Sequence, residues 1–273
     1  MSLTVNGPIM RISSLLLPLA ALAVTGCATT ARTADEQALA VELDSRSIVP
    51  ATSQERTAIR SQDMLTQATF WAEAHELNPS DLEAAYELSN ALRQLGNPQR
   101  AIEIAQQALA LHPDSPQLLL AYGTALTSTG RGTRATESLQ RAAQADPTNW
   151  RILNTLGIAH EQGGQSERAR EYFRQALALS PSEPSVMSNL ALSYALSGEA
   201  ETAERMLREA MIRPGAEAAV RQNLALVIAL QGRFNEAEEV ARYDVTPAMA
   251  QANMAYVRAM LTSRRSYDSL RGD

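Results

Sequence analysis

Small and apolar residues recur along the chain at a constant spacing of 34 residues. Glycine and alanine each fill a column of five positions with this spacing, which chance does not produce. These positions are Gly96, Gly130, Gly164, Gly198 and Gly232, and Ala101, Ala135, Ala169, Ala203 and Ala237. A second alanine column and a leucine or tyrosine column share the period. They comprise Ala74, Ala108, Ala142, Ala176 and Ala210, and Leu88, Tyr122, Leu156, Leu190 and Leu224. The chain is therefore built from a repeated unit.

Each column predicts one feature of a unit made of two helices and a turn. The first alanine column and the residues that follow the leucine column are small because two helices approach closely there, where larger side chains would separate them. The residues after the leucine column are Ser89, Gly123, Gly157, Ala191 and Ala225. The glycine column marks the end of the first helix, a place that favours a left-handed backbone. The second helix ends before a proline, which is tolerated after a helix but not within one. These prolines are Pro79, Pro113, Pro147 and Pro181.

Residues that favour helix starts indicate the same boundaries. Ser80-Asp81-Leu82-Glu83 has the pattern of a capping box. Ser115-Pro116 and Asn97-Pro98 each place a capping residue before a proline at the first helical position. The predicted repeats span about 48–81, 82–115, 116–149, 150–183, 184–216 and 217–243. The first is degenerate, because Pro50 falls in its first helix, although its second helix, about Gln62–Leu77, keeps Trp71.

A period of 34 with small residues in these places resembles the tetratricopeptide repeat, a helix-turn-helix unit that stacks into a superhelix. The resemblance implies an all-α solenoid of about five to six repeats over residues 56–243. Residues 244–273 are expected to form a capping helix and a tail. The helix is predicted over Thr246–Arg264, which begins with Thr-Pro and places Met249, Met254, Val257 and Leu261 at helical spacing.

The N-terminal segment has the layout of an export signal. Ile12–Val24 is an unbroken run of apolar and small residues, with Arg11 before it and Thr25-Gly26 after it. The run is about 13 residues long, whereas a helix needs about 20 to cross a bilayer. We therefore interpret residues 1–26 as a signal peptide. Met10 is a second possible start, because residues 10–27 form a compact signal by themselves.

The single cysteine of the chain, Cys27, directly follows this signal. Val24-Thr25-Gly26-Cys27 resembles the bacterial lipobox, in which the cysteine sulfur receives a diacylglycerol. Ala28 stands where an aspartate would favour the inner membrane. The resemblance thus implies a protein anchored by lipid to the periplasmic face of the outer membrane of a Gram-negative bacterium. The alternative is an ordinary signal that is cut nearby and leaves a free thiol. Residues 27–55 are polar and predict a tether that spans about 30 Å.

Composition excludes several kinds of chemistry. The formal net charge is −6, and all 24 basic residues are arginine, so a P-loop lysine, a Schiff-base lysine and an SxxK serine hydrolase are ruled out. The acidic charge and the export signal argue against a nucleic-acid partner. His75, His112 and His160 lack ligand partners at metal spacing, and His160 occupies a packing column. We expect no enzyme activity, no cofactor and no small-molecule substrate.

In tetratricopeptide proteins the concave face is lined by the first helix of each repeat, so the resemblance assigns partner-binding residues to these helices. They are Tyr86, Asn90, Arg93, Asn154, Ile158, Glu161, Asn189, Leu192, Asn223, Leu226 and Leu230. The set predicts a groove that passes from polar to apolar along the solenoid. Asn189 and Asn223 are 34 residues apart, so their amides could bind the backbone of an extended peptide or, alternatively, neighbouring helices or water. The missing lysines argue against a clamp for a terminal carboxylate.

Residues 213–261 contain three segments that a generic repeat does not require, namely RQNLALV, ALQGRFNEAE and NMAYVRAML. The sequence of this stretch resembles that of the tight adherence (Tad/Flp, type IVc) pilus assembly lipoproteins of the TadD family. The resemblance implies a non-enzymatic outer-membrane accessory, similar to a pilotin, that binds the secretin or another pilus-assembly component. One alternative is a pilotin or scaffold of another envelope machine, such as an ordinary type IV pilus. Another is an adaptor of cell-wall enzymes, which would need a catalytic domain.

Overall fold

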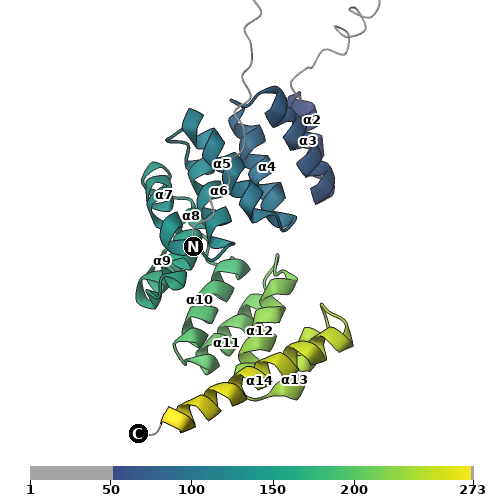
Figure 1. The fold of residues 1–273 in the computed structure, drawn as a ribbon, viewed down its shortest axis with the longest axis vertical. Coiled ribbons are helices and arrows are strands. Elements are labelled where there is room, and N and C mark those ends of the chain that lie inside the picture. The colour runs from purple at the N-terminus through teal and green to yellow at the C-terminus, as the bar shows by residue number, and fades with distance from the viewer. Residues whose placement is uncertain (1–51, 272–273) are drawn as a thin grey trace, which may run out of the picture. The chain divides into compact units, whose positions relative to one another are not determined.

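The computed structural model describes the backbone of residues 52–271 and the side chains of residues 52–262. The signal peptide, Cys27 and most of the predicted tether lie outside the described residues. The described part consists of helices joined by short turns and contains no strand (Figure 1). The helices are α2 (Ser53–Ile59), α3 (Met64–Leu77), α4 (Leu82–Gln94), α5 (Pro98–Leu111), α6 (Pro116–Thr127), α7 (Gly132–Ala145), α8 (Trp150–Gln162), α9 (Ser166–Leu179), α10 (Pro184–Leu196), α11 (Ala200–Met211), α12 (Ala218–Leu230), α13 (Phe234–Ala241) and α14 (Pro247–Arg271).

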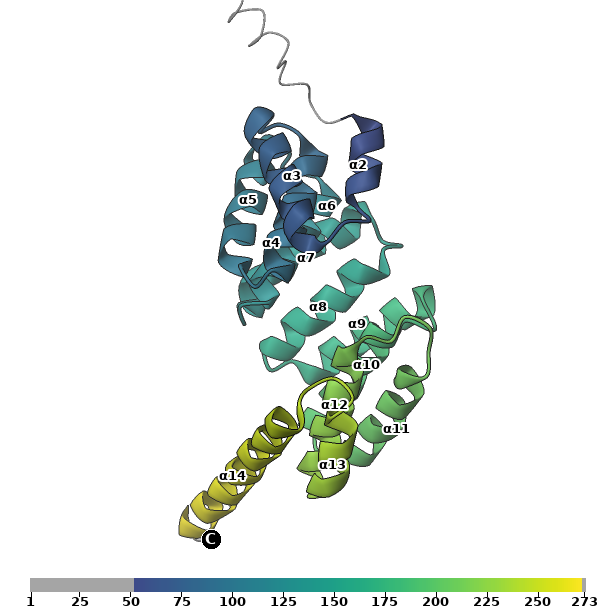
Figure 2. The same cartoon turned by 90° about the vertical axis from the view of Figure 1, so that its right-hand side faces the viewer.

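The helices form antiparallel pairs that stack in chain order, as the predicted solenoid requires. Each helix packs on the next along the chain, and the first helix of a pair also contacts the first helix of the following pair, as α4 does α6 and α10 does α12. Figure 2 shows the pairs following one another to α14 at the end. The predicted repeats match these pairs. Helix α2 begins at Ser53, two residues before the predicted end of the tether.

The helix ends follow the predicted chemistry, with one correction. Asn97 and Ser115 accept hydrogen bonds from the N–H groups of Arg100 and Leu118, as expected for capping residues. The capping box predicted at Ser80 is wrong. Asp81 caps α4 instead, because its carboxylate accepts from the N–H of Ala84 while it also pairs with Arg56. The predicted box partner Glu83 pairs with Arg56 and Arg60.

The glycine and alanine columns have the geometry that the pattern predicted. All five glycines of the column have positive φ, between 72° and 88°. All five alanines of the first alanine column are fully buried. The closest approach lies at Gly157, where a Cβ atom would lie 2.4 Å from the ring of Phe173 on the paired helix. The small columns therefore set the distance between paired helices.

Substitution of leucine for Ala169 is expected to lower the free energy of unfolding by about 1–3 kcal/mol, because the added carbons must displace well-packed neighbours. Ala169 is 0% exposed and lies in the core that α8 and α9 share. Thermal melts followed by circular dichroism measure the effect.

The matched control for this substitution is Glu171→Gln on the same helix, which is expected to change stability by less than about 0.5 kcal/mol. Glu171 is exposed, whereas the equally exposed Glu167 binds Arg170 at 2.5 Å and is unsuitable. Coincident melts of the Ala169→Leu and Glu171→Gln variants would contradict the assigned packing.

Helix α14 covers the last pair, as predicted, but with a different set of residues. Ala250, Met254 and Val257 are buried, and Leu261 packs beside them. Met249, which the sequence pattern included, is 53% exposed, because it directly precedes the buried Ala250 and so lies about 100° around the helix from it. None of the helices in the described part is both long and apolar enough to cross a membrane.

Candidate partner-binding groove

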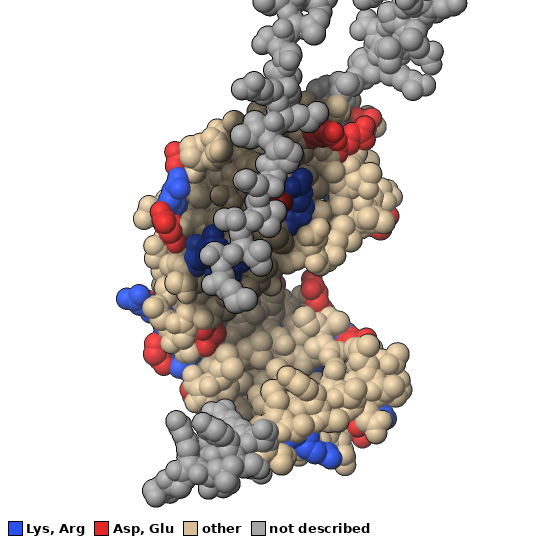
Figure 3. Space-filling view, viewed as in Figure 1, with Lys and Arg blue, Asp and Glu red and all other residues tan. Residues whose placement is uncertain are grey.

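The first helices of five consecutive pairs line one elongated cavity, which we call the concave groove. Its walls come from α4, α6, α8, α10 and α12, together with the turns before α10 and α12, and its volume is about 580 Å³. Figure 3 shows the hollowed face of the solenoid with basic side chains inside the hollow. The second helices of the pairs contribute no residue to it. This arrangement follows from the repeat, because equivalent helices of successive units present the same face.

Six of the eleven predicted binding residues line the concave groove. They are Tyr86, Asn90, Arg93, Asn154, Asn189 and Asn223. The other five do not. Ile158 is half-buried against the core, and Glu161 accepts a hydrogen bond from the Oγ of Ser166. Leu192, Leu226 and Leu230 are half-buried against the cluster of α10–α14. The α10–α12 end of the groove is consequently polar, and the predicted apolar strip does not line it.

Asparagine amides connect neighbouring repeats along the groove. Asn189 donates from Nδ2 to the Oδ1 of Asn154 over 2.9 Å, and Asn223 donates from Nδ2 to the Oγ of Ser188 over 2.9 Å. The amides thus bond neighbouring helices, which was one of the two predicted roles. The Oδ1 atoms of Asn189 and Asn223 have no hydrogen-bond partner among the described residues, so each still offers an acceptor. Both atoms are free to receive the backbone N–H of a ligand.

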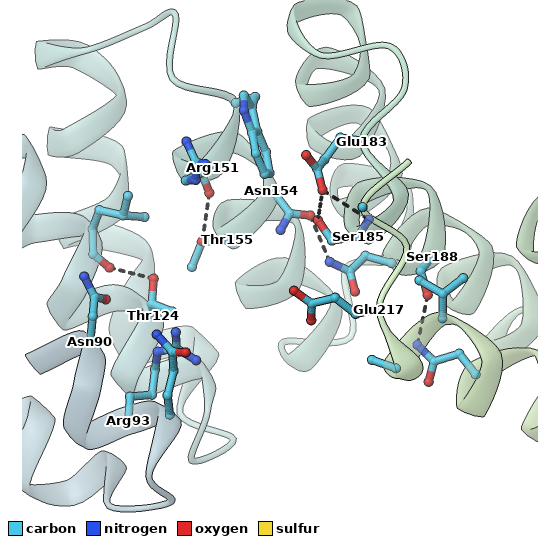
Figure 4. A pocket seen from close by; sticks show the side chains of 18 of the residues that line it. Asn90, Arg93, Thr124, Arg151, Asn154, Thr155, Glu183, Ser185, Ser188 and Glu217 are labelled. Carbon is cyan, nitrogen blue, oxygen red and sulfur yellow. Dashed lines mark hydrogen bonds between the residues drawn. The ribbon is translucent and has the colours of Figure 1, made fainter. Parts of the chain in front are cut away.

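Basic side chains line the groove on α4 and α8, and acidic side chains line it on α4, at Glu87, and beside α10 and α12. Arg93 and Arg151 line it on α4 and α8, while Glu183 and Glu217 line it beside α10 and α12. Figure 4 shows Arg93 beside Asn90 and Thr124, with Glu183 and Glu217 on the other side of the cavity. The guanidinium of Arg151 lies 4.5 Å from the centroid of the Trp150 ring. The arginines that line the groove are therefore confined to its α4–α8 part, whereas the charged residues that line its α10–α12 part are both glutamates.

Burial shifts the pKa of two groove residues on α4, Arg93 and Glu87. It lowers the pKa of Arg93 from the usual arginine value, and only the nearby Tyr86 opposes the change. Burial also raises the pKa of Glu87, which Arg60 opposes, and Glu83 adds to the rise. Both side chains are partly removed from solvent where they form the wall of the groove. A ligand that supplies opposite charge at either position would offset this cost.

Sequence reasoning missed several residues of the groove. The missed residues that carry polar or aromatic groups are Glu87, Gln94, Thr124, Trp150, Thr155, Glu183, Ser185, Ser188 and Glu217. Glu183 and Glu217 are the N-cap residues of α10 and α12, 34 positions apart. Their shared position in the repeat could therefore have identified these two glutamates from the sequence. These two residues were missed because the predicted columns left out the turns that lead into the helices, whereas the other missed residues lie within helices.

The histidines lie outside the groove. His160 is 6% exposed, forms a 2.8 Å hydrogen bond with Gln165 and stacks on Tyr172. His112 forms a hydrogen bond with the carbonyl of Ser80. Within the described residues no group of histidine, cysteine, aspartate and glutamate side chains could hold a metal ion. His160 therefore has a packing role, and His112 links two turns by a hydrogen bond.

Comparison with known proteins gives a family and a fold. A model of the tetratricopeptide repeat family matches residues 71–116, 86–149, 120–184 and 154–217, which together span more than half of the chain. No curated protein matches.

Many solved structures share the fold, and three of them illustrate the likeness. PilW, a type IV pilus biogenesis factor, is 23% identical with a TM-score of 0.57, over 76% of this chain and 94% of that one. PilF of Pseudomonas aeruginosa is 22% identical with a TM-score of 0.51, over 71% and 90%. A thermophilic repeat protein of Thermus thermophilus is 21% identical with a TM-score of 0.58, over 65% and 98%.

Proposed function

The chain belongs to the tetratricopeptide repeat family, and from this premise we propose that it is an outer-membrane lipoprotein that binds protein partners during assembly of a Tad/Flp-type pilus. In this proposal it acts as a scaffold similar to a pilotin and catalyses no reaction. Tetratricopeptide proteins are generally non-catalytic scaffolds. The partner is the secretin or another component of pilus assembly.

The observation that carries the binding role is the concave groove. It is a long polar cavity to which five repeats contribute, with unsatisfied amide oxygens and separated charges along its walls. A cavity of this kind suits an extended segment of protein, since amides can bind a peptide backbone while charged side chains select among segments.

Membrane attachment and the pilus role rest on different observations. Attachment rests on the lipobox pattern that ends at Cys27. The pilus role rests on the sequence of residues 213–261, a stretch that forms α12, α13 and the first part of α14 in the structure. PilW, whose fold this chain shares, is a type IV pilus biogenesis factor, and this adds support for a role in pilus biogenesis. It also keeps an ordinary type IV pilus as the second candidate.

Site-specific cross-linking in the source bacterium tests the proposal. A photoreactive benzoylphenylalanine at Asn90, which lines the groove, is expected to cross-link to the secretin or to another pilus-assembly component. The matched control places the same residue at Gln106, which is exposed on α5 and outside the groove. It is expected to give no such product. Mass spectrometry identifies the cross-linked protein.

The possible products separate the alternatives. A component of another envelope machine at Asn90 would overturn the Tad/Flp assignment and keep the groove. Pilus components at Gln106 alone would move binding to the convex face. The genes beside this one give an independent check, because a prepilin, a secretin and a secretion ATPase are expected there. Genes for cell-wall enzymes in their place would favour the adaptor alternative.

A further inference from the structure

Arg93 differs from the other arginines of the solenoid. In the part of the chain that the structure describes, three arginines have a buried Nε without a hydrogen-bond partner, namely Arg93, Arg170 and Arg213. The terminal nitrogens of Arg170 and Arg213 form ion pairs with glutamates. Arg93 forms no ion pair with a described residue, and it lines the concave groove. It is thus a partly buried cation whose open side faces a binding cavity.

This placement has a cost that a ligand can relieve. Burial lowers the pKa of Arg93, although a guanidinium remains charged in proteins at neutral pH. Removing a charge from water without a counter-charge is unfavourable, and a carboxylate is the natural partner because guanidinium binds it through two parallel hydrogen bonds. In the free protein the solvation of Arg93 is already partly lost. A carboxylate that enters the groove therefore gains a pairing without the full desolvation cost.

The surroundings of Arg93 indicate a segment of protein with one acidic position. Asn90 and Gln94 line the groove on the same helix as Arg93, and Arg151 adds a second positive charge on α8. Glu87 also lines the groove on α4, but its carboxylate already pairs with Arg60 at 3.3 Å. Glu183 and Glu217 line the groove farther along the solenoid (Figure 4). A second acidic residue that reached these glutamates would be repelled. The free amide oxygens of Asn189 and Asn223 along the same wall suit a peptide backbone.

We propose that the concave groove binds an extended segment of a protein partner in one direction, with an acidic side chain on Arg93 and a neutral or basic stretch beside Glu183 and Glu217. This rests on the proposed function, because it concerns the same groove. Charge complementarity commits the site to a carboxylate-bearing peptide. A free inorganic anion would use only the α4–α8 end.

Selection of displayed peptides tests the proposal. Displayed peptides of 12 random residues are selected for binding to the immobilised full-length protein. The selected peptides are then synthesised with both ends capped. The wild type is expected to enrich peptides with an acidic residue at a fixed position and few acidic residues toward one end. The Arg93→Gln variant is expected to lose the acidic preference. The matched control Arg205→Gln is expected to keep it, since Arg205 is exposed on α11 and outside the groove.

Binding of one selected peptide then measures the pairing. Replacing its acidic residue by the amide is expected to weaken binding to the wild type about tenfold or more. The amide peptide should bind the wild type and Arg93→Gln equally, which isolates the pair. Arg93→Gln is expected to melt at the same temperature as Arg205→Gln or higher, since it removes an unpaired charge. A lower melting temperature together with an unchanged acidic preference would assign Arg93 a structural role and overturn the proposal.

The remaining outcomes separate this inference from the proposed function. Groove-binding peptides are identified by cross-linking to benzoylphenylalanine at Asn90 and not at Gln106. If such peptides show no acidic preference, the inference about Arg93 fails and the groove remains a peptide site. If no peptide cross-links at Asn90, both fail. Competition of an acidic peptide by millimolar inorganic phosphate, with no preference at the Glu183–Glu217 end, would identify a free-anion site and contradict the proposal.

Discussion

Replacement of Phe173 by alanine is expected to lower the free energy of unfolding by about 3–5 kcal/mol, because it removes a large buried ring and leaves a cavity. Phe173 is 1% exposed and belongs to a core cluster that contains residues from α5 to α10. Its ring covers Gly157, which has no side chain to fill the space that the ring would leave. Urea unfolding followed by circular dichroism measures the change as a lower midpoint.

The matched control for this prediction is Gln175→Ala on the same helix. Gln175 is exposed, so its replacement is expected to change stability by less than about 0.5 kcal/mol. Because each repeat is stabilised mainly by contacts with its neighbours, the loss at Phe173 should also reduce the cooperativity between the two halves of the solenoid. Equal midpoints for Phe173→Ala and Gln175→Ala would show that the ring does not hold α8 and α9 together.

The 34-residue period was sufficient to predict the helix pairs because it reports backbone constraints that every repeat shares. Gly164 illustrates this, since φ of +72° is a requirement of the turn itself and leaves a trace in the sequence. The N-cap of α4 was assigned to Ser80 instead of Asp81 for a local reason. Ser80 and Asp81 are both good caps, and the choice between them depends on Arg56, a distant partner that no local pattern contains.

The candidate site was only partly predictable, because a column fixes the face of a helix but not what its side chain meets. Asn189 and Asn223 were placed on the correct face, but their bonds to Asn154 and Ser188 depend on the exact approach of neighbouring helices. The leucines at 192, 226 and 230 lie at the border between the groove face and the packing face of a helix. A rotation of a few tens of degrees moves such residues between the two, and periodicity does not resolve it.

The Cys27→Ser substitution is expected to abolish lipid attachment and maturation entirely. This prediction rests on the position of the only cysteine at the end of the apolar signal run. Two or more acyl chains anchor a protein stably where one is marginal, so the mature wild type should stay with membranes through a high-salt wash. The variant should remain an uncut precursor without labelled palmitate, because lipid attachment precedes cleavage at a lipobox. Fractionation of the wild type, precursor size and palmitate labelling measure these effects.

The same variant distinguishes a lipoprotein signal from an ordinary one. An ordinary signal requires only small residues near the cut, and serine is as small as cysteine, so it would be cut normally in Cys27→Ser. The control Thr29→Ser keeps the cysteine and should mature, take up palmitate and remain with membranes. Normal maturation of Cys27→Ser would therefore contradict the lipid anchor while leaving export intact.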